Sequence, residues 1–161
     1  MSASKLRSTS WISLLAMLAA LLILAAAPAV AAPPSSFTAV TLGTVQPTSE
    51  STFQLSGVGT GSRIGAYTYE GEVVVESVDQ NGVITDTLTE TLRLANGDTI
   101  TILCHQVAVP VSPGVYEGTD QWTVIGGTGR YAGASGSGTG TTHVDLNDGT
   151  FAKSMTGSIQ R

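Results

Sequence analysis

The sequence predicts an all-β protein: an antiparallel up-and-down barrel of about eight strands, preceded by a secretory signal peptide. From Phe37 onward, apolar residues alternate with Thr, Ser and Glu, and no helical period is present. The runs are broken by dipeptides that favour tight turns, namely Asn81-Gly82, Asn96-Gly97, Pro113-Gly114, Gly126-Gly127 and Asp148-Gly149. Short connections make sequential strands antiparallel, and closure of the sheet removes its unpaired edges. A β-sandwich is the alternative.

The positions of the strands follow from the spacing of these turns. We expect strands at residues 37–45, 52–60, 65–78, 83–94, 99–109, 115–125, 134–145 and 150–160.

The N-terminal segment has the pattern of an export signal. Lys5 and Arg7 precede an apolar run over residues 11–27, and Ala29-Val30-Ala31 offers the small residues of a cleavage site. We therefore expect a signal peptide over residues 1–31, a short linker over 32–36 and the barrel over 37–161. This organisation predicts a secreted, periplasmic or extracellular protein without stable membrane insertion after cleavage. An uncleaved membrane anchor is the alternative.

Charge restricts the partners of the barrel. Two of the 7 basic residues lie in the predicted signal peptide, and the remaining 5 stand against 12 acidic residues, which gives a net charge of −7. The basic residues are scattered singly, at Arg63, Arg93, Arg130, Lys153 and Arg161. Nucleic acid and anionic membrane surfaces both need clustered positive charge, so we expect neither as a partner.

Cys104 is the only cysteine, so the chain forms no internal disulfide and depends on its core. It is in phase with Ile100 and Ile102, which favours a small buried side chain over a nucleophile. The adjacent His105 points to the opposite face of the strand, which excludes a Cys-His pair. No metal-binding or nucleotide-binding motif stands in a suitable context, and we expect no metal and no cofactor.

The apolar phase of each strand predicts the inward-facing side chains. These are Phe53, Leu55, Tyr67, Tyr69, Val73, Val75, Ile100, Ile102, Cys104, Tyr116, Trp122, Val124, Phe151, Met155 and Ile159. Gly57, Gly59, Gly61, Gly136, Gly138 and Gly140 fall on the same face. Inward glycines relieve crowding around aromatic rings or leave a cavity for a ligand, and the first role is the commoner one in small barrels.

The stretch Trp122–Gly138, WTVIGGTGRYAGASGSG, joins an apolar strand to a glycine-rich turn and a strand of small residues. We expect Gly126, Gly127 and Gly129 to reverse the chain there, because glycine accepts positive φ. This stretch resembles the allene oxide cyclase and dirigent barrel superfamily. The resemblance implies the barrel fold, and it raises an isomerase, cyclase or stereo-directing activity as a hypothesis. The catalytic residues of that superfamily match no positions here, so catalytic residues remain unknown.

Two groups of carboxylates stand out. Glu70, Glu72 and Glu76 lie opposite the apolar phase, and we expect them on the solvated outer face. Asp86, Glu90 and Asp120 share the phase of apolar neighbours. We expect these three near the rims of the barrel, where water reaches them; the alternative is a lumenal position with Lys153 as the counter-charge.

Three functions remain open: a module that binds a small apolar ligand in its lumen, an isomerase or stereo-directing protein, and a non-catalytic scaffold. Candidate ligand-binding residues are Tyr67, Tyr69, Asp86, Glu90, Tyr116, Asp120 and Trp122. We expect an aromatic-walled site and no hydrolase activity, since no nucleophile or paired base accompanies them. A cavity that holds one of the three carboxylates beside a second polar group would favour the isomerase.

Overall fold

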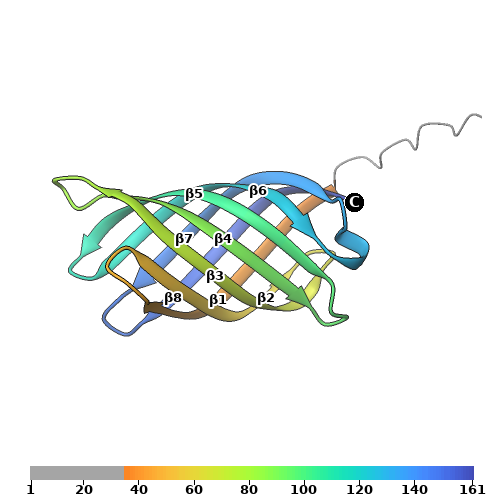
Figure 1. Cartoon of the computed structure of the whole chain (residues 1–161), viewed down its shortest axis with the longest axis horizontal. Helices are drawn as coiled ribbons and strands as arrows, with labels where there is room; N and C mark the ends of the chain where they lie inside the picture. Colours follow the sequence, from red (N-terminus) through yellow and green to blue (C-terminus); the bar gives the residue numbers. More distant parts are fainter. Residues whose placement is uncertain (1–34) are drawn as a thin grey trace, which may run out of the picture. The chain divides into compact units, whose positions relative to one another are not determined.

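The computed structural model describes residues 35–161, which form one closed antiparallel barrel in the order β1-β2-β3-β4-β5-β6-β7-β8 (Figure 1). The strands are β1 (Ser35–Pro47), β2 (Thr52–Gly61), β3 (Gly65–Val78), β4 (Ile84–Leu94), β5 (Thr99–Ser112), β6 (Val115–Gly127), β7 (Ser135–Asp145) and β8 (Thr150–Gln160). The up-and-down barrel is confirmed, and the sandwich alternative is wrong because β1 also pairs with β8. The predicted signal peptide lies outside the described residues.

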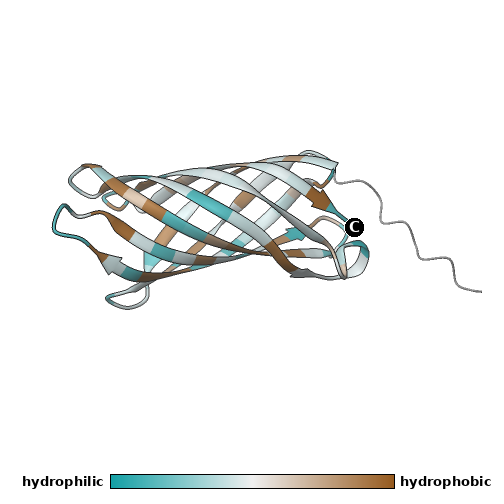
Figure 2. Cartoon of the chain, turned by 90° about the horizontal axis from the view of Figure 1, so that it is seen from above, coloured by the Kyte–Doolittle hydropathy of each residue, from teal (hydrophilic) through white to brown (hydrophobic). Residues whose placement is uncertain are grey.

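The alternation of side chains fixes which face of each strand is buried. In β3, for example, Tyr67, Tyr69 and Gly71 are buried while the residues between them are exposed. Glu70 and Glu72 lie on the outer face, as expected. Figure 2 shows hydrophobic and hydrophilic segments interspersed along the strands, as a sheet with one inner face requires. Among residues 35–161 there is no helix with the length and apolar character to span a membrane.

The turns follow the sequence at most positions. Gly82, Gly97, Gly114 and Gly149 all have positive φ, as their turn dipeptides predict. The expectation for Gly126 and Gly127 was wrong: neither has positive φ, and both belong to β6. The chain reverses after them, through Gly129 at φ 58° and the single-turn helix η1 (Gly129–Tyr131).

Glycines make room for aromatic rings in the middle of the barrel. A Cβ atom on Gly59 would lie 2.3 Å from the ring of Tyr67, and one on Gly138 would lie 2.5 Å from the ring of Trp122. Both distances are far inside van der Waals contact. These glycines therefore relieve crowding, and the central lumen is filled with side chains.

The barrel has two ends that differ in construction. The turn end carries the β1–β2, β3–β4, β5–β6 and β7–β8 connections, whereas the η1 end carries the β2–β3 and β4–β5 turns, η1 and the C-terminus (Figure 1). Asp98 joins two connections of the η1 end, because its carboxylate accepts from the backbone N–H and the side-chain Nε of Arg130 at 3.3 and 3.2 Å.

Candidate functional site

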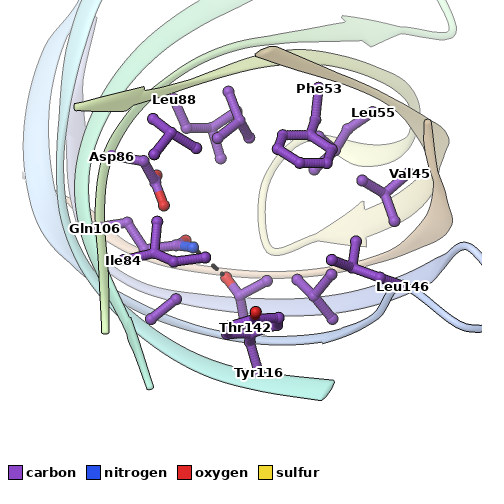
Figure 3. A pocket seen from close by; sticks show the side chains of 14 residues that line it. Val45, Phe53, Leu55, Ile84, Asp86, Leu88, Gln106, Tyr116, Thr142 and Leu146 are labelled. Atoms are coloured by element: carbon purple, nitrogen blue, oxygen red, sulfur yellow. Dashed lines mark hydrogen bonds between the residues drawn. The ribbon is translucent and has the colours of Figure 1, made fainter. Parts of the chain in front are cut away.

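A pocket opens at the turn end of the barrel. It has a volume of about 60 Å³, and its walls are mainly aliphatic. A water molecule needs at least about 10–15 Å³ of such space, so the pocket has room for several waters or for part of a small organic molecule. Figure 3 shows the lining side chains directed toward a common space; the apolar ones include Val45, Phe53, Leu55, Val73, Ile84, Leu88, Val144 and Leu146.

On β5 the inward side chains become smaller toward this end, from Ile100 and Ile102 to Ala108. On β5, Ala108 lines the wall, where a larger residue would fill the space. Tyr116 on β6 is half-buried and is one of two aromatic residues in the lining. The expected aromatic wall is therefore corrected to an aliphatic wall with Phe53 and Tyr116 in it.

The polar part of the lining, which we call the floor, consists of three side chains: Asp86 on β4, Gln106 on β5 and Thr142 on β7. Asp86 and Gln106 are direct partners across the β4–β5 pair. Each lies two residues deeper in its strand than Ile84 and Ala108, which also line the pocket. The Thr142 hydroxyl donates to the Gln106 Oε1 at 3.3 Å. The floor is thus polar, whereas the rest of the lining, which includes Leu88 still deeper in β4, is apolar (Figure 3).

Asp86 is the only acidic or basic residue in the lining of the pocket. Its side chain is directed into the pocket, its exposed fraction is 3%, and its Oδ1 has no hydrogen-bond partner in the protein (Figure 3). Burial raises the pKa of Asp86 to about 7, Lys153 opposes this rise, and Asp120 and Glu76 add to it. The carboxyl group therefore changes charge near neutral pH.

A cluster of buried charges borders the floor, since Asp120 is the cross-strand partner of Gln106 and Lys153 is that of Thr142. Lys153 on β8 donates to Glu90 Oε1 on β4, and its Nζ lies 3.2 Å from Asp120 Oδ2 on β6. All three side chains have zero side-chain exposure. The ammonium is disfavoured by burial, but the carboxylates of Glu90 and Asp120 raise the pKa of Lys153 above its ordinary value. Lys153 is therefore protonated and positively charged at neutral pH.

This cluster corrects the expected rim position of the carboxylates. Asp86, Glu90 and Asp120 have exposed fractions of 3%, 0% and 4%, so water does not solvate them as it would at a rim. The lumenal alternative, with Lys153 as the counter-charge, is the arrangement found for Glu90 and Asp120. Asp86 lies in the pocket floor and forms no ion pair with Lys153.

Cys104 completes the central cluster. Its thiol donates to Glu90 Oε1 at 3.3 Å, and Lys153 Nζ donates to its sulfur at 3.3 Å. Burial, followed by the charge of Glu90, raises the pKa of the thiol well above its ordinary value. Because a thiol in this state forms no thiolate at neutral pH, Cys104 is a buried structural residue, as its strand phase predicts.

The predicted aromatic residues are divided between the pocket and the packed interior. Tyr67 is hydrogen-bonded through its hydroxyl to Thr41 at 2.8 Å, and Tyr69 packs against Phe151 with ring centroids 5.4 Å apart. Trp122 packs edge-on against Phe37 at 5.7 Å and donates from its indole nitrogen to the Thr139 carbonyl at 3.1 Å. Tyr67, Tyr69 and Trp122 therefore do not line the pocket.

The structure thus brings together two of the seven candidate residues, Asp86 and Tyr116, at the pocket. Gln106 and Thr142 were not predicted, although both carried a signal: Gln106 is in phase with Ile102 and Cys104, and Thr142 is in phase with the inward glycines of β7. Polar residues on an inward phase next to a candidate carboxylate would have identified them. Among residues 35–161 no group of His, Cys, Asp and Glu is arranged to hold a metal ion.

Comparison with family models and with curated proteins finds no match. Among solved structures, the chain is similar to a pterocarpan synthase dirigent protein, with 14% sequence identity and a TM-score of 0.44; the match covers 80% of this chain and 85% of that chain. The match is to a dirigent protein, and the allene oxide cyclase part of the sequence resemblance stays a prediction. A likeness at this level says nothing about ligand or reaction.

Proposed function

We propose that the protein binds a small, largely apolar molecule in the pocket at the turn end of the barrel. The observation that carries this proposal is the combination of aliphatic walls with one unpartnered carboxyl group on the floor. Ligand sites commonly have this composition, in which apolar walls supply affinity and few polar groups supply orientation. The filled centre of the barrel limits the ligand to this end.

Calorimetric titration with 1-hexanol tests the proposal. We expect saturable binding that Ala108→Leu weakens at least fivefold, because the added atoms of leucine occupy the pocket. Val109→Leu is the matched control, since Val109 is adjacent in β5 but faces outward. Circular dichroism verifies that both variants keep the barrel. Absence of saturable binding to the wild-type protein, or equal loss in both variants, would contradict the proposal.

A second candidate is an isomerase or stereo-directing function at the same pocket. It is favoured by the position of Asp86 beside Gln106, because a carboxyl group with a pKa of about 7 can both accept and donate a proton at neutral pH. Its test is proton exchange at the carbon next to the carbonyl of 2-hexanone in deuterated water, followed by NMR. Exchange that the wild-type protein accelerates and Asp86→Asn does not would support this function, whereas equal exchange with both proteins would exclude it for such ketones.

A further inference from the structure

The turn-end pocket contains an acid without a counter-charge. The three charged groups that act on Asp86 are Lys153 on β8, Asp120 on β6 and Glu76 on β3. Two of these are acidic, and the single cation already pairs with Glu90 and Asp120. The buried charges of the barrel are therefore three acids, Asp86 included, against one base.

The unsatisfied atom identifies where a counter-charge belongs. Oδ1 of Asp86 is buried and has no donor within the protein, although the group lines a pocket open to solvent. Gln106, the partner of Asp86 across the strand pair, accepts from Thr142 through Oε1, and its Nε2 donates no hydrogen bond to Asp86 Oδ1. Leaving a buried carboxylate oxygen unpaired is costly, so a ligand that donates to it gains more than its apolar contacts alone provide.

We infer that the ligand of this pocket is a small hydrophobic amine in its protonated form, whose ammonium group donates to Asp86 while its hydrocarbon part packs against the aliphatic walls. The inference rests on the proposed binding function and specifies the chemical class of the ligand. A carboxylic acid of the same size meets a like charge on the floor and in the central cluster. A neutral alcohol fills the walls but does not balance the charge of Asp86.

Binding of such an amine depends on pH in a defined direction. Because the pKa of free Asp86 is about 7, the group is mostly protonated at pH 6 and mostly ionised at pH 8. The ammonium requires the ionised form, so its affinity rises between these two pH values, by about tenfold for a group with this pKa. The affinity for a neutral alcohol does not require Asp86 to be ionised.

The experiment compares n-hexylamine, 1-hexanol and hexanoate by calorimetry at pH 6 and pH 8. We expect hexylamine to bind at least tenfold more tightly than hexanol at pH 8 and hexanoate to bind most weakly. Asp86→Asn should lower the affinity for hexylamine at least tenfold and remove its dependence on pH. Glu70→Gln is the matched control, because it removes one carboxylate of the outer face that does not act on Asp86 and should keep the preference for the amine.

The possible outcomes distinguish a failure of the amine assignment from a failure of the proposed binding function. Hexanol binding as tightly as hexylamine at pH 8 would overturn the amine assignment and leave the apolar pocket in place. A preference for the amine that survives in Asp86→Asn would also overturn it, because the charge of another group would then be responsible. Failure of all three compounds to bind would overturn both the amine assignment and the proposed function.

Discussion

The two ends of the barrel are built from the same alternating strands, yet one is open and the other is closed. At the η1 end, Tyr131 is 1% exposed and the Arg161 guanidinium lies 5.2 Å from the centroid of its ring. Phe37 and Ile159 are buried at the same end. At the turn end, four short connections leave the lumen uncovered, and the corresponding tyrosine, Tyr116, is only half-buried. The η1 end is thus closed by an aromatic residue from an irregular connection together with the side chains around it, whereas the short connections of the turn end supply no aromatic residue.

The buried charges lie between these two ends. Removing the cation among them should lower the free energy of unfolding more than the other substitutions considered below. Lys153→Met keeps most of the side-chain volume but leaves Glu90 and Asp120 without their cation. We expect a loss of about 3–5 kcal/mol in the free energy of unfolding, the usual cost of breaking a buried ion pair on one side. Urea denaturation measures it.

Arg93→Met is the matched control for Lys153→Met. Arg93 is exposed on β4, so its replacement should change the free energy of unfolding by less than about 0.5 kcal/mol. Equal stability of the Lys153→Met variant and the wild-type protein would mean that the contacts of Lys153 with Glu90 and Asp120 do not stabilise the fold.

Replacing one tyrosine by alanine at each end tests how differently the two ends are packed. Tyr131→Ala removes a fully buried ring from the η1 end and should cost about 3 kcal/mol, as large-to-small changes in a core do. Tyr116→Ala removes a half-buried ring from the turn end and should cost about 1 kcal/mol, because less apolar area is lost. Thermal and urea unfolding of the two variants would contradict this account if Tyr116→Ala were the more destabilising.

Two glycines of the Trp122–Gly138 stretch should respond differently to the addition of one methyl group. A Cβ on Gly138 would lie 2.0 Å from the Thr156 carbonyl oxygen and 2.5 Å from the Trp122 ring, so Gly138→Ala should cost about 2 kcal/mol. Gly126 has open space around its Cβ position and no positive φ. Gly126→Ala is thus expected to be close to neutral, and a similar loss in both variants would show that packing around Trp122 is not the cause.

Much of the fold could be predicted from the sequence because alternation and turn dipeptides are local signals. The bounds expected for β3 and β8 coincide with those observed, and the other strands differ from the prediction by at most three residues at either end. Gly126 and Gly127 were misassigned because adjacent glycines permit a turn without requiring one. Here β6 continues through them, and one of the two irregularities in its pairing with β5 falls nearby, between Thr101 and Ile102 on the opposite strand.

The candidate site was only partly predictable, for a reason that Asp86 and Glu90 illustrate. The phase of β4 indicates that both side chains face inward. It carries no information on their depth along the barrel axis, because depth depends on how the eight strands are staggered. Whether an inward carboxylate lies at a rim, on a pocket floor or beside Lys153 is decided by strands distant in sequence. Closure of the η1 end by Tyr131 was likewise not predicted, since its position depends on how η1 folds over the lumen.

The central claim is that the turn end admits a small apolar molecule and the η1 end does not. Methyl NMR spectra recorded during a titration with 1-hexanol test it directly, because both ends carry aliphatic reporters. The account predicts saturable shifts for Val45, Leu55 and Val144 at the turn end, with Ile64 and Ile159 at the η1 end unchanged. Shifts confined to the η1 end or to the exposed Leu42 and Val58 of the outer face, or none at any concentration, would contradict it.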